Sequence, residues 1–286
     1  AQAVMQVPWL VRHGFRYRPC FRHPALKSVF VLMLPVMVST WIQPVNQLIS
    51  TRFASYLFSG AGASAMEYAN TLYTMITGIL VLSITNVMFP EMSRLSSSGK
   101  EAELGTLVGS TLRGMLFLLL PMMAGLMLLA KPIVRLLYEY QSWDAFSTEI
   151  TARALCFMSL GMVGYGIQNV LSRAFYAQQN GKTPMISGAI SILVNLLLCL
   201  LLSQRLDVAG LSIATAASST VSAVLLLIPM MRKYPGALDR GFWIAILKMA
   251  ACTAGMAAAV WGTGQCLKLW LADGMFSRVL LVGLPT

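Results

Sequence analysis

Seven uncharged, mostly apolar runs, separated by charged residues, dominate this sequence of 286 residues. Each run is 17 to 24 residues long, and a helix needs about 20 residues to cross the roughly 30 Å hydrocarbon core of a bilayer. We therefore predict seven transmembrane helices, over residues 28–51, 68–90, 114–130, 154–172, 183–204, 208–231 and 249–267. An eighth apolar segment begins near Met275, contains only the charge of Arg278 and reaches Thr286, which predicts part of an eighth helix.

The composition excludes a water-soluble enzyme and a disordered chain. Only 11% of the residues are charged and 57% are hydrophobic, whereas soluble domains carry about 25% charged residues. The predicted fold class is therefore an all-α integral membrane protein, built as a multi-helix transporter lobe. The net charge of +11 is typical of cationic loops at an anionic membrane face, so we expect membrane lipids and no nucleic acid as partners.

The distribution of Lys and Arg predicts the orientation of the chain. The side that carries residues 1–24 holds roughly twice as many of these cations as the opposite side, which places it in the cytoplasm. Residues 1–24 alternate arginines with aromatic rings and are predicted to form a basic amphipathic linker on the membrane surface. Because the chain starts without Met and ends inside an apolar stretch, we expect it to be the second half of a larger protein.

Polar side chains at membrane depth are the best candidates for function, since burying them costs free energy that packing does not require. The first predicted span contains a stripe of four such residues on one helical face: Gln43, Asn46, Gln47 and Ser50. A stripe of this kind faces either a neighbouring helix or a water-filled cavity. Four polar groups exceed the needs of one interhelical hydrogen bond, and this favours the cavity.

Two charges flank the outer ends of the first two spans, Arg52 and Glu67. They either pair with each other at the water boundary or reach it separately by snorkelling, or Arg52 offers its guanidinium group to a phosphate. Spacing alone favours the first two alternatives. Other polar residues at depth are more often helix–helix hydrogen bonds than ligand contacts; they are Asn70, Thr71, Asn86, Gln168, Asn169 and Asn195. No run carries Asp, Glu, Lys or His at its middle, and the five cysteines form no closely spaced pair. Both observations argue against an integral membrane enzyme or a metal site.

Several stretches resemble one transporter family. They are 67–73 (Glu-Tyr-Ala-Asn-Thr-Leu-Tyr), 86–93 (Asn-Val-Met-Phe-Pro-Glu-Met-Ser), 132–139, and 173–178 (Arg-Ala-Phe-Tyr-Ala-Gln) followed by Lys-Thr-Pro at 182–184. In this order they are similar to the MurJ/MviN family, the lipid II flippases of the MOP transporter superfamily. The resemblance covers most of the chain, and it implies that the seven spans are helices seven to thirteen of a fourteen-helix protein.

The resemblance also implies a mechanism and a domain organisation. Two six-helix lobes would rock around a cationic cavity that accepts the head group of lipid II, in the bacterial cytoplasmic membrane. Residues 25–231 would form the C-terminal lobe, and 232–286 would hold the penultimate helix and the start of the last one, whose groove carries the lipid tail. The substrate cavity would include Gln43, Asn46, Gln47, Ser50, Arg52, Asn70 and Thr71.

Two departures from the family pattern leave alternatives open. Thr71 stands where many members have an arginine, so another MOP-type exporter, of a different lipid-linked oligosaccharide or an amphipathic drug, is the main competitor; a non-transporting membrane scaffold is another. Some members bind Na⁺ at positions that match Ser50, Asn195, Cys199 and Thr215. Asn195 and Thr215 suit a cation, but Ser50 and Cys199 carry no negative charge. We therefore expect no cofactor and doubt coupling to Na⁺.

Overall fold

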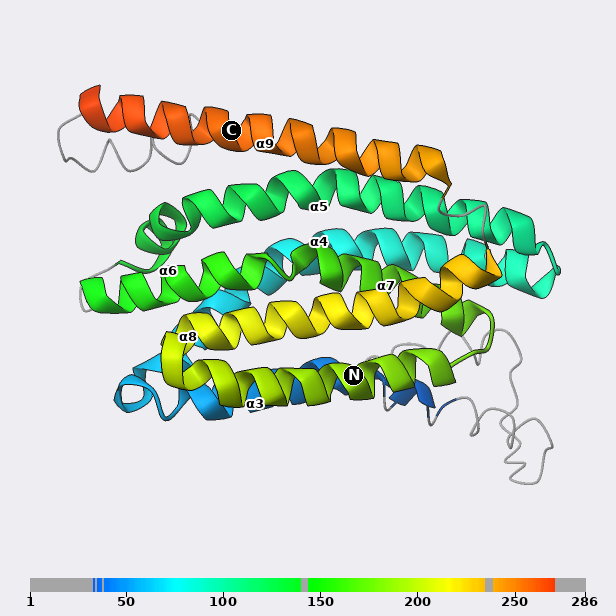
Figure 1. Ribbon diagram of the computed structural model, residues 1–286, viewed down its shortest axis with the longest axis horizontal. Coiled ribbons are helices and arrows are strands. Elements are labelled where there is room, and N and C mark those ends of the chain that lie inside the picture. Colours follow the sequence, from blue (N-terminus) through cyan, green and yellow to red (C-terminus); the bar gives the residue numbers. More distant parts are fainter. Residues whose placement is uncertain (1–32, 34, 38, 140–143, 235–238, 271–286) are drawn as a thin grey trace, which may run out of the picture.

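The computed structural model describes residues 33, 35–37, 39–139, 144–234 and 239–270, and within these ranges it contains helices and no β-strand. The long helices run side by side along the long axis of the molecule (Figure 1). The elements are α3 (Ile42–Ala54), η1 (Phe58–Gly60), α4 (Ala61–Ser97), α5 (Glu101–Tyr138), α6 (Ala145–Ser159), α7 (Met162–Ala177), α8 (Lys182–Lys233) and α9 (Arg240–Trp270). This architecture confirms the predicted all-α membrane fold.

The described helices follow the predicted spans after the first. Of the first run, 28–51, residues 28–32, 34 and 38 lie outside the described residues, and α3 covers only its end. The runs 68–90, 114–130 and 249–267 lie within α4, α5 and α9, each of which continues into the flanking charged residues. By length and composition, α4, α5, α8 and α9 can each cross a membrane, and the bent pair of α6 and α7 makes a fifth candidate. Residues 1–24 and the segment that begins at Met275 lie outside the described residues.

Helix α8 contains two predicted spans, 183–204 and 208–231, because the chain reverses at Asp207. This residue has φ 50° and ψ −133°, which breaks the helix into two limbs. The limbs lie side by side (Figure 1), and the Ser191 hydroxyl on the first donates a hydrogen bond of 3.0 Å to the Ser218 carbonyl on the second. The interruption by Arg205 and Asp207 in the sequence therefore marks a tight hairpin.

The run 154–172, predicted as one helix, is divided between α6 and α7. The two helices meet at a bend of 46°. At the bend, Gly161 lies so close to α8 that a Cβ atom on it would approach the Ala216 Cα atom to 2.7 Å. The absence of charge in this run indicates a hydrocarbon environment, but it carries no information about where a neighbouring backbone passes.

The lobe is apolar outside and contains polar groups inside. On the first limb of α8, the exposed positions include Leu193, Leu197 and Leu200, spaced as one helical face. The buried residues include hydroxyl-bearing ones such as Ser191 and Ser212, each 1% exposed or less. This distribution is expected where hydrocarbon surrounds the protein, because a polar group there has no water to bind.

Helix α9 lies at the edge of the bundle and packs on α5 (Figure 1). Its start is fixed by Asp239, whose carboxylate accepts the backbone N–H of Phe242 at 2.8 Å and a guanidinium N–H of Arg113 at 2.7 Å. The Phe242 ring is 3% exposed and lies beneath the Arg113 guanidinium, 5.7 Å from its carbon. Beyond this anchor, nearly all the described side chains of α9 are at least partly exposed.

The contact between α7 and α8 gives a direct test of this packing. A Cβ atom on Gly164 would lie 2.8 Å from the backbone nitrogen of Thr220, whereas one on Gly125 of α5 would meet nothing within 4 Å. Gly164→Ala should therefore destabilise the full-length protein by about 1–3 kcal/mol through overpacking, and Gly125→Ala should not, because Ala favours helices. Thermal unfolding in detergent measures both; equal midpoints would contradict the observed α7–α8 contact.

Candidate functional site

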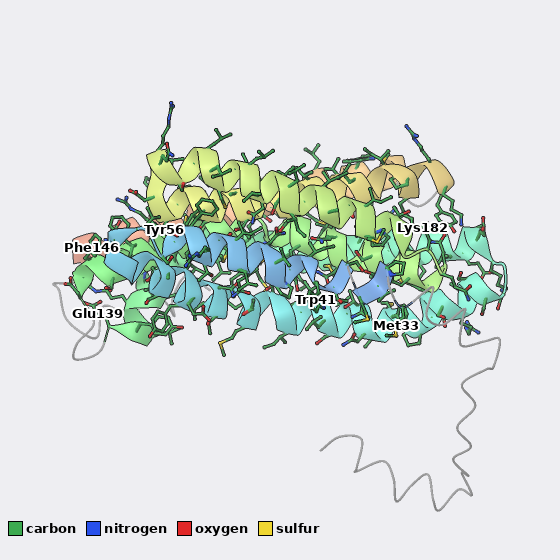
Figure 2. All side chains as sticks on the ribbon, turned by 90° about the horizontal axis from the view of Figure 1, so that it is seen from below. Met33, Trp41, Tyr56, Glu139, Phe146 and Lys182 are labelled. Atoms are coloured by element: carbon green, nitrogen blue, oxygen red, sulfur yellow. The ribbon has the colours of Figure 1, made fainter. Side chains whose placement is uncertain are left out.

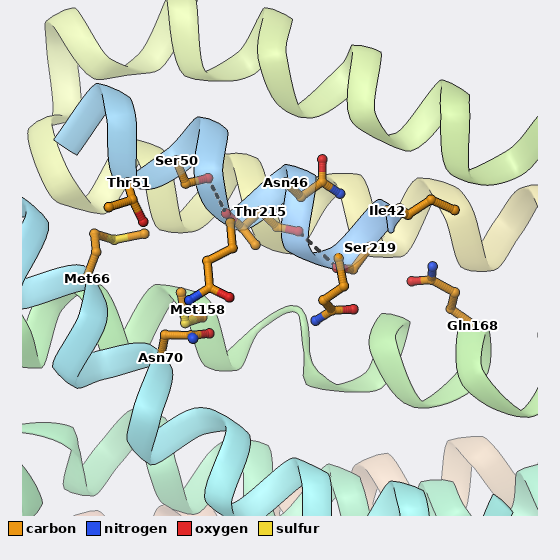
Figure 3. A pocket seen from close by; sticks show the side chains of 12 residues that line it. Ile42, Asn46, Ser50, Thr51, Met66, Asn70, Met158, Gln168, Thr215 and Ser219 are labelled. Carbon is orange, nitrogen blue, oxygen red and sulfur yellow. Dashed lines mark hydrogen bonds between the residues drawn. The ribbon is translucent and has the colours of Figure 1, made fainter. Parts of the chain in front are cut away.

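A polar pocket lies where α3 meets α4, α6, α7 and the second limb of α8 (Figure 3). Its volume of about 40 Å³ has room for roughly three water molecules. The side chains that line it come from all five of these elements: Ile42, Gln43, Asn46, Gln47, Ser50, Thr51, Met66, Asn70, Met158, Gln168, Thr215 and Ser219. The pocket thus exists only because the hairpin in α8 and the bend between α6 and α7 bring distant segments to α3.

The four residues of the predicted stripe on α3 all line this pocket, but they differ in exposure. Asn46 and Ser50 are 8% and 2% exposed and face the neighbouring helix α8. Gln43 and Gln47 are exposed. Asn46 and Ser50 therefore pack against a neighbouring helix, and Gln43 and Gln47 lie at the open side of the pocket. These are the two environments that the sequence allowed for the stripe.

Of the three other predicted cavity residues, one lines the pocket and two do not. Asn70 of α4 lines the pocket, whereas Thr71 is exposed beside it and donates its hydroxyl to the Glu67 carbonyl at 2.9 Å. Arg52 lies outside the lining; its guanidinium carbon is 5.5 Å from the centre of the Tyr56 ring. Within the described ranges, no ion pair joins Arg52 to Glu67, so the predicted alternative of a mutual pair does not hold.

Sequence reasoning left several lining residues out of the site. Gln168 was a polar candidate at depth, but nothing in its spacing connects it to α3, because the bend before α7 decides where it points. Ser219 follows Thr215 by one helical turn and donates to the Thr215 carbonyl at 3.1 Å (Figure 3). That spacing indicates that Ser219 lies on the same helical face as Thr215 and could line the same site. Met66 and Met158 form apolar parts of the pocket wall, and nothing in the sequence distinguishes them from core residues.

Next to the pocket, a buried cluster joins α3 to both limbs of α8. The Ser50 Oγ atom is 3.1 Å from Thr215 Oγ1 and 3.9 Å from Cys199 Sγ. The Cys199 thiol donates to Asn195 Oδ1 at 3.7 Å, and the Asn195 amide donates to the Asn46 carbonyl at 3.2 Å. Asn195 is fully buried and lies outside the pocket lining, whereas Thr215 belongs to both.

The chemistry of the pocket is that of uncharged hydrogen-bonding groups. Its lining carries amides, hydroxyls and apolar side chains, and none of the lining residues is charged. Within the described part of the chain, no three His, Cys, Asp or Glu side chains lie where they could hold a metal ion. Amides both donate and accept, so the pocket suits polar, uncharged parts of a ligand.

Comparisons with known proteins give one consistent family. A family model described as "Lipid II flippase MurJ" matches residues 1–281. A relative from Rhizobium meliloti (strain 1021), named "Probable lipid II flippase MurJ", is 31% identical over 251 residues, which cover 88% of this chain and 46% of that protein. A protein of the same name from Vibrio cholerae is 26% identical over 286 residues and covers 99% of this chain and 54% of its own length.

Two solved structures share the fold. One is a lipid II flippase MurJ in an inward closed conformation, with a TM-score of 0.73 and 22% identity, over 99% of this chain and 57% of that one. The other is the Vibrio cholerae MATE transporter VcmN in the bent form, with a TM-score of 0.61 and 14% identity, over 87% and 53%. The chain spans about half the length of the curated relatives it matches. It is a multi-pass protein of the bacterial cytoplasmic membrane, and it belongs to the lipid II flippase MurJ family.

Proposed function

We propose that this chain is the C-terminal part of a flippase that moves the lipid-linked peptidoglycan precursor lipid II across the cytoplasmic membrane by alternating access. The observation that carries the proposal is the polar face on α3, where Gln43 and Gln47 are exposed on a segment that the sequence predicts to span the membrane. Amide side chains turned toward lipid would lose their hydrogen bonds. This face therefore borders water and a second, N-terminal lobe, in a cavity through which a polar head group passes.

The uncharged polar groups at the open side of the pocket support a role in contacting the head group. Amides and hydroxyls line the pocket on α3, α4, α7 and α8, and hydrogen bonds from such groups suit the sugar portion of a lipid-linked saccharide. Transport of this kind needs no covalent step: the protein lowers the barrier by replacing the hydration of the head group with its own polar side chains.

Arg52 is the nearest cation on α3 for the pyrophosphate. It is exposed at the end of the helix, and its guanidinium group lies over a tyrosine ring rather than against a carboxylate. Such a group is available for a phosphate, which it binds through paired hydrogen bonds. We assign Arg52 to the pyrophosphate and the pocket to uncharged parts of the head group.

We propose that the lipid tail runs along α9. This helix packs on α5 and leaves most of its described surface open, which suits a helix at the edge of a tail-binding groove. We propose that 232–286 form this groove, that 25–231 form the lobe, and that 1–24 form the basic cytoplasmic linker before it.

Water access to the α3 face can be measured by cysteine labelling. In the full-length transporter in membranes, Gln47→Cys should react with a water-soluble maleimide, whereas Leu197→Cys, on the outer face of α8, should not. Labelling of the unsubstituted protein, which includes the five cysteines of this chain, is subtracted. If both positions react equally, or neither reacts, the α3 face does not border a water-filled cavity.

The pocket amides should matter for transport. In a vesicle assay, the double change Gln43→Leu and Gln47→Leu should slow lipid II flipping by about tenfold, since two neutral hydrogen bonds contribute roughly 1–3 kcal/mol. Gln204→Leu is the matched control, because Gln204 is exposed near the α8 hairpin and outside the pocket lining. A drug-efflux test runs beside it, since Thr71 in place of an arginine favours the alternative MOP exporter; activity with drugs alone would overturn the proposal.

The role of Arg52 is tested by binding. Arg52→Ala should weaken lipid II binding to the full-length transporter by about tenfold, as expected for loss of a charged hydrogen bond. Arg232→Ala, which removes an exposed cation at the end of α8, should leave binding within about twofold of the unsubstituted protein. Equal losses of lipid II binding from the two changes would mean that Arg52 only anchors the helix at the membrane boundary.

A further inference from the structure

Three buried side chains and one half-buried side chain, from three helical segments, form one connected cluster beside the pocket. Ser50 comes from α3, Asn195 and Cys199 come from the first limb of α8, and Thr215 comes from the second limb. Ser50 is 2% exposed, and Asn195 and Cys199 are fully buried. These are the positions at which the family resemblance implies a bound Na⁺, and the fold does bring them together.

The chemistry of the cluster does not suit a cation. Its side chains are two hydroxyls, a thiol and an amide, with no carboxylate to offset a buried positive charge, and an uncompensated charge in this environment is costly. Na⁺ is a hard cation that prefers oxygen ligands, whereas a thiol is a soft one. The residues present therefore do not fit the ion.

The polar atoms of the cluster also engage one another. Ser50 Oγ lies 3.1 Å from Thr215 Oγ1, and Asn195 Oδ1 accepts the Cys199 thiol at 3.7 Å. The Asn195 amide reaches across to the Asn46 carbonyl at 3.2 Å. Near them, Asn46 Oδ1 is a buried acceptor without a partner among the described residues. A single neutral amide oxygen of this kind supplies no negative charge that could offset a cation.

We propose that Ser50, Asn195, Cys199 and Thr215 form a neutral hydrogen-bond clamp that fastens α3 to both limbs of α8, and that this protein holds no Na⁺ there. The clamp joins the three segments through hydrogen bonds of its side chains, without a bound ion. The clamp is tested by the midpoint of thermal unfolding and not by transport. Its failure and the failure of the proposed transport function can therefore be told apart.

Thermal unfolding of the purified full-length transporter in different salts tests the clamp. The midpoints in NaCl, KCl and choline chloride at equal ionic strength should agree within about 1 °C. The double change Ser50→Asp and Cys199→Asp introduces two carboxylates, so it should create a Na⁺ site and a midpoint that is about 2–4 °C higher in NaCl than in KCl. A Na⁺-specific stabilisation of the unsubstituted protein would overturn the proposal.

A single hydroxyl deletion tests the clamp without adding charge. Ser50→Ala should lower the midpoint by about 2–4 °C in all three salts, since the Ser50 hydroxyl contacts Cys199 on the first limb of α8 and Thr215 on the second, and both contacts are lost. Ser110→Ala is the matched control: the Ser110 hydroxyl is exposed and bonds only to the Leu107 carbonyl of its own helix. If Ser50→Ala melts at the same temperature as Ser110→Ala, the cluster does not hold α3 in place.

Discussion

Hydrocarbon cannot hydrogen-bond, and this constraint explains why many polar side chains of the lobe lie between helices. Leucines cover the outer face of the first limb of α8, while serines, threonines and Asn195 are buried between helices. The exposed amides of Gln43 and Gln47 on α3 depart from this rule. Figure 2 shows α3 on one flank of the bundle, between Trp41 at its start and Tyr56 beyond its end. A flank that keeps its amides exposed is the surface that a second lobe and water would share.

The pocket depends on two interruptions of regular helix. Asp207 turns α8 back on itself, so that Thr215 and Ser219 reach the same side of the lobe as Asn195. At the 46° bend between α6 and α7, Gly161 packs closely on Ala216 of α8. Irregular backbone is tolerated in membranes where it is buried or lines a cavity. Both breaks are of this kind, and together they surround α3 with polar groups.

The sequence predicted the helical fold well, because the length of each uncharged run is set by the thickness of the bilayer. It also predicted that Gln43, Asn46, Gln47 and Ser50 share a face, since helical periodicity is local. It could not show that Gln168 joins them or that Arg52 points away, because both depend on bends and rotations of helices that are set by packing. The contact of Ser50 with Cys199 and Thr215 links residues about 150 positions apart, and only the family resemblance had connected them.

We propose that the α3 face touches the head group of lipid II. Photocrosslinking tests it most directly: a photoreactive residue is placed at position 47 or at position 193 of the full-length transporter, and lipid II is added in membranes. We expect adducts that contain the sugar portion from position 47. We expect none from position 193, which lies on the outer face of α8. Head-group adducts from position 193, or their absence at 47 in an active transporter, would contradict it.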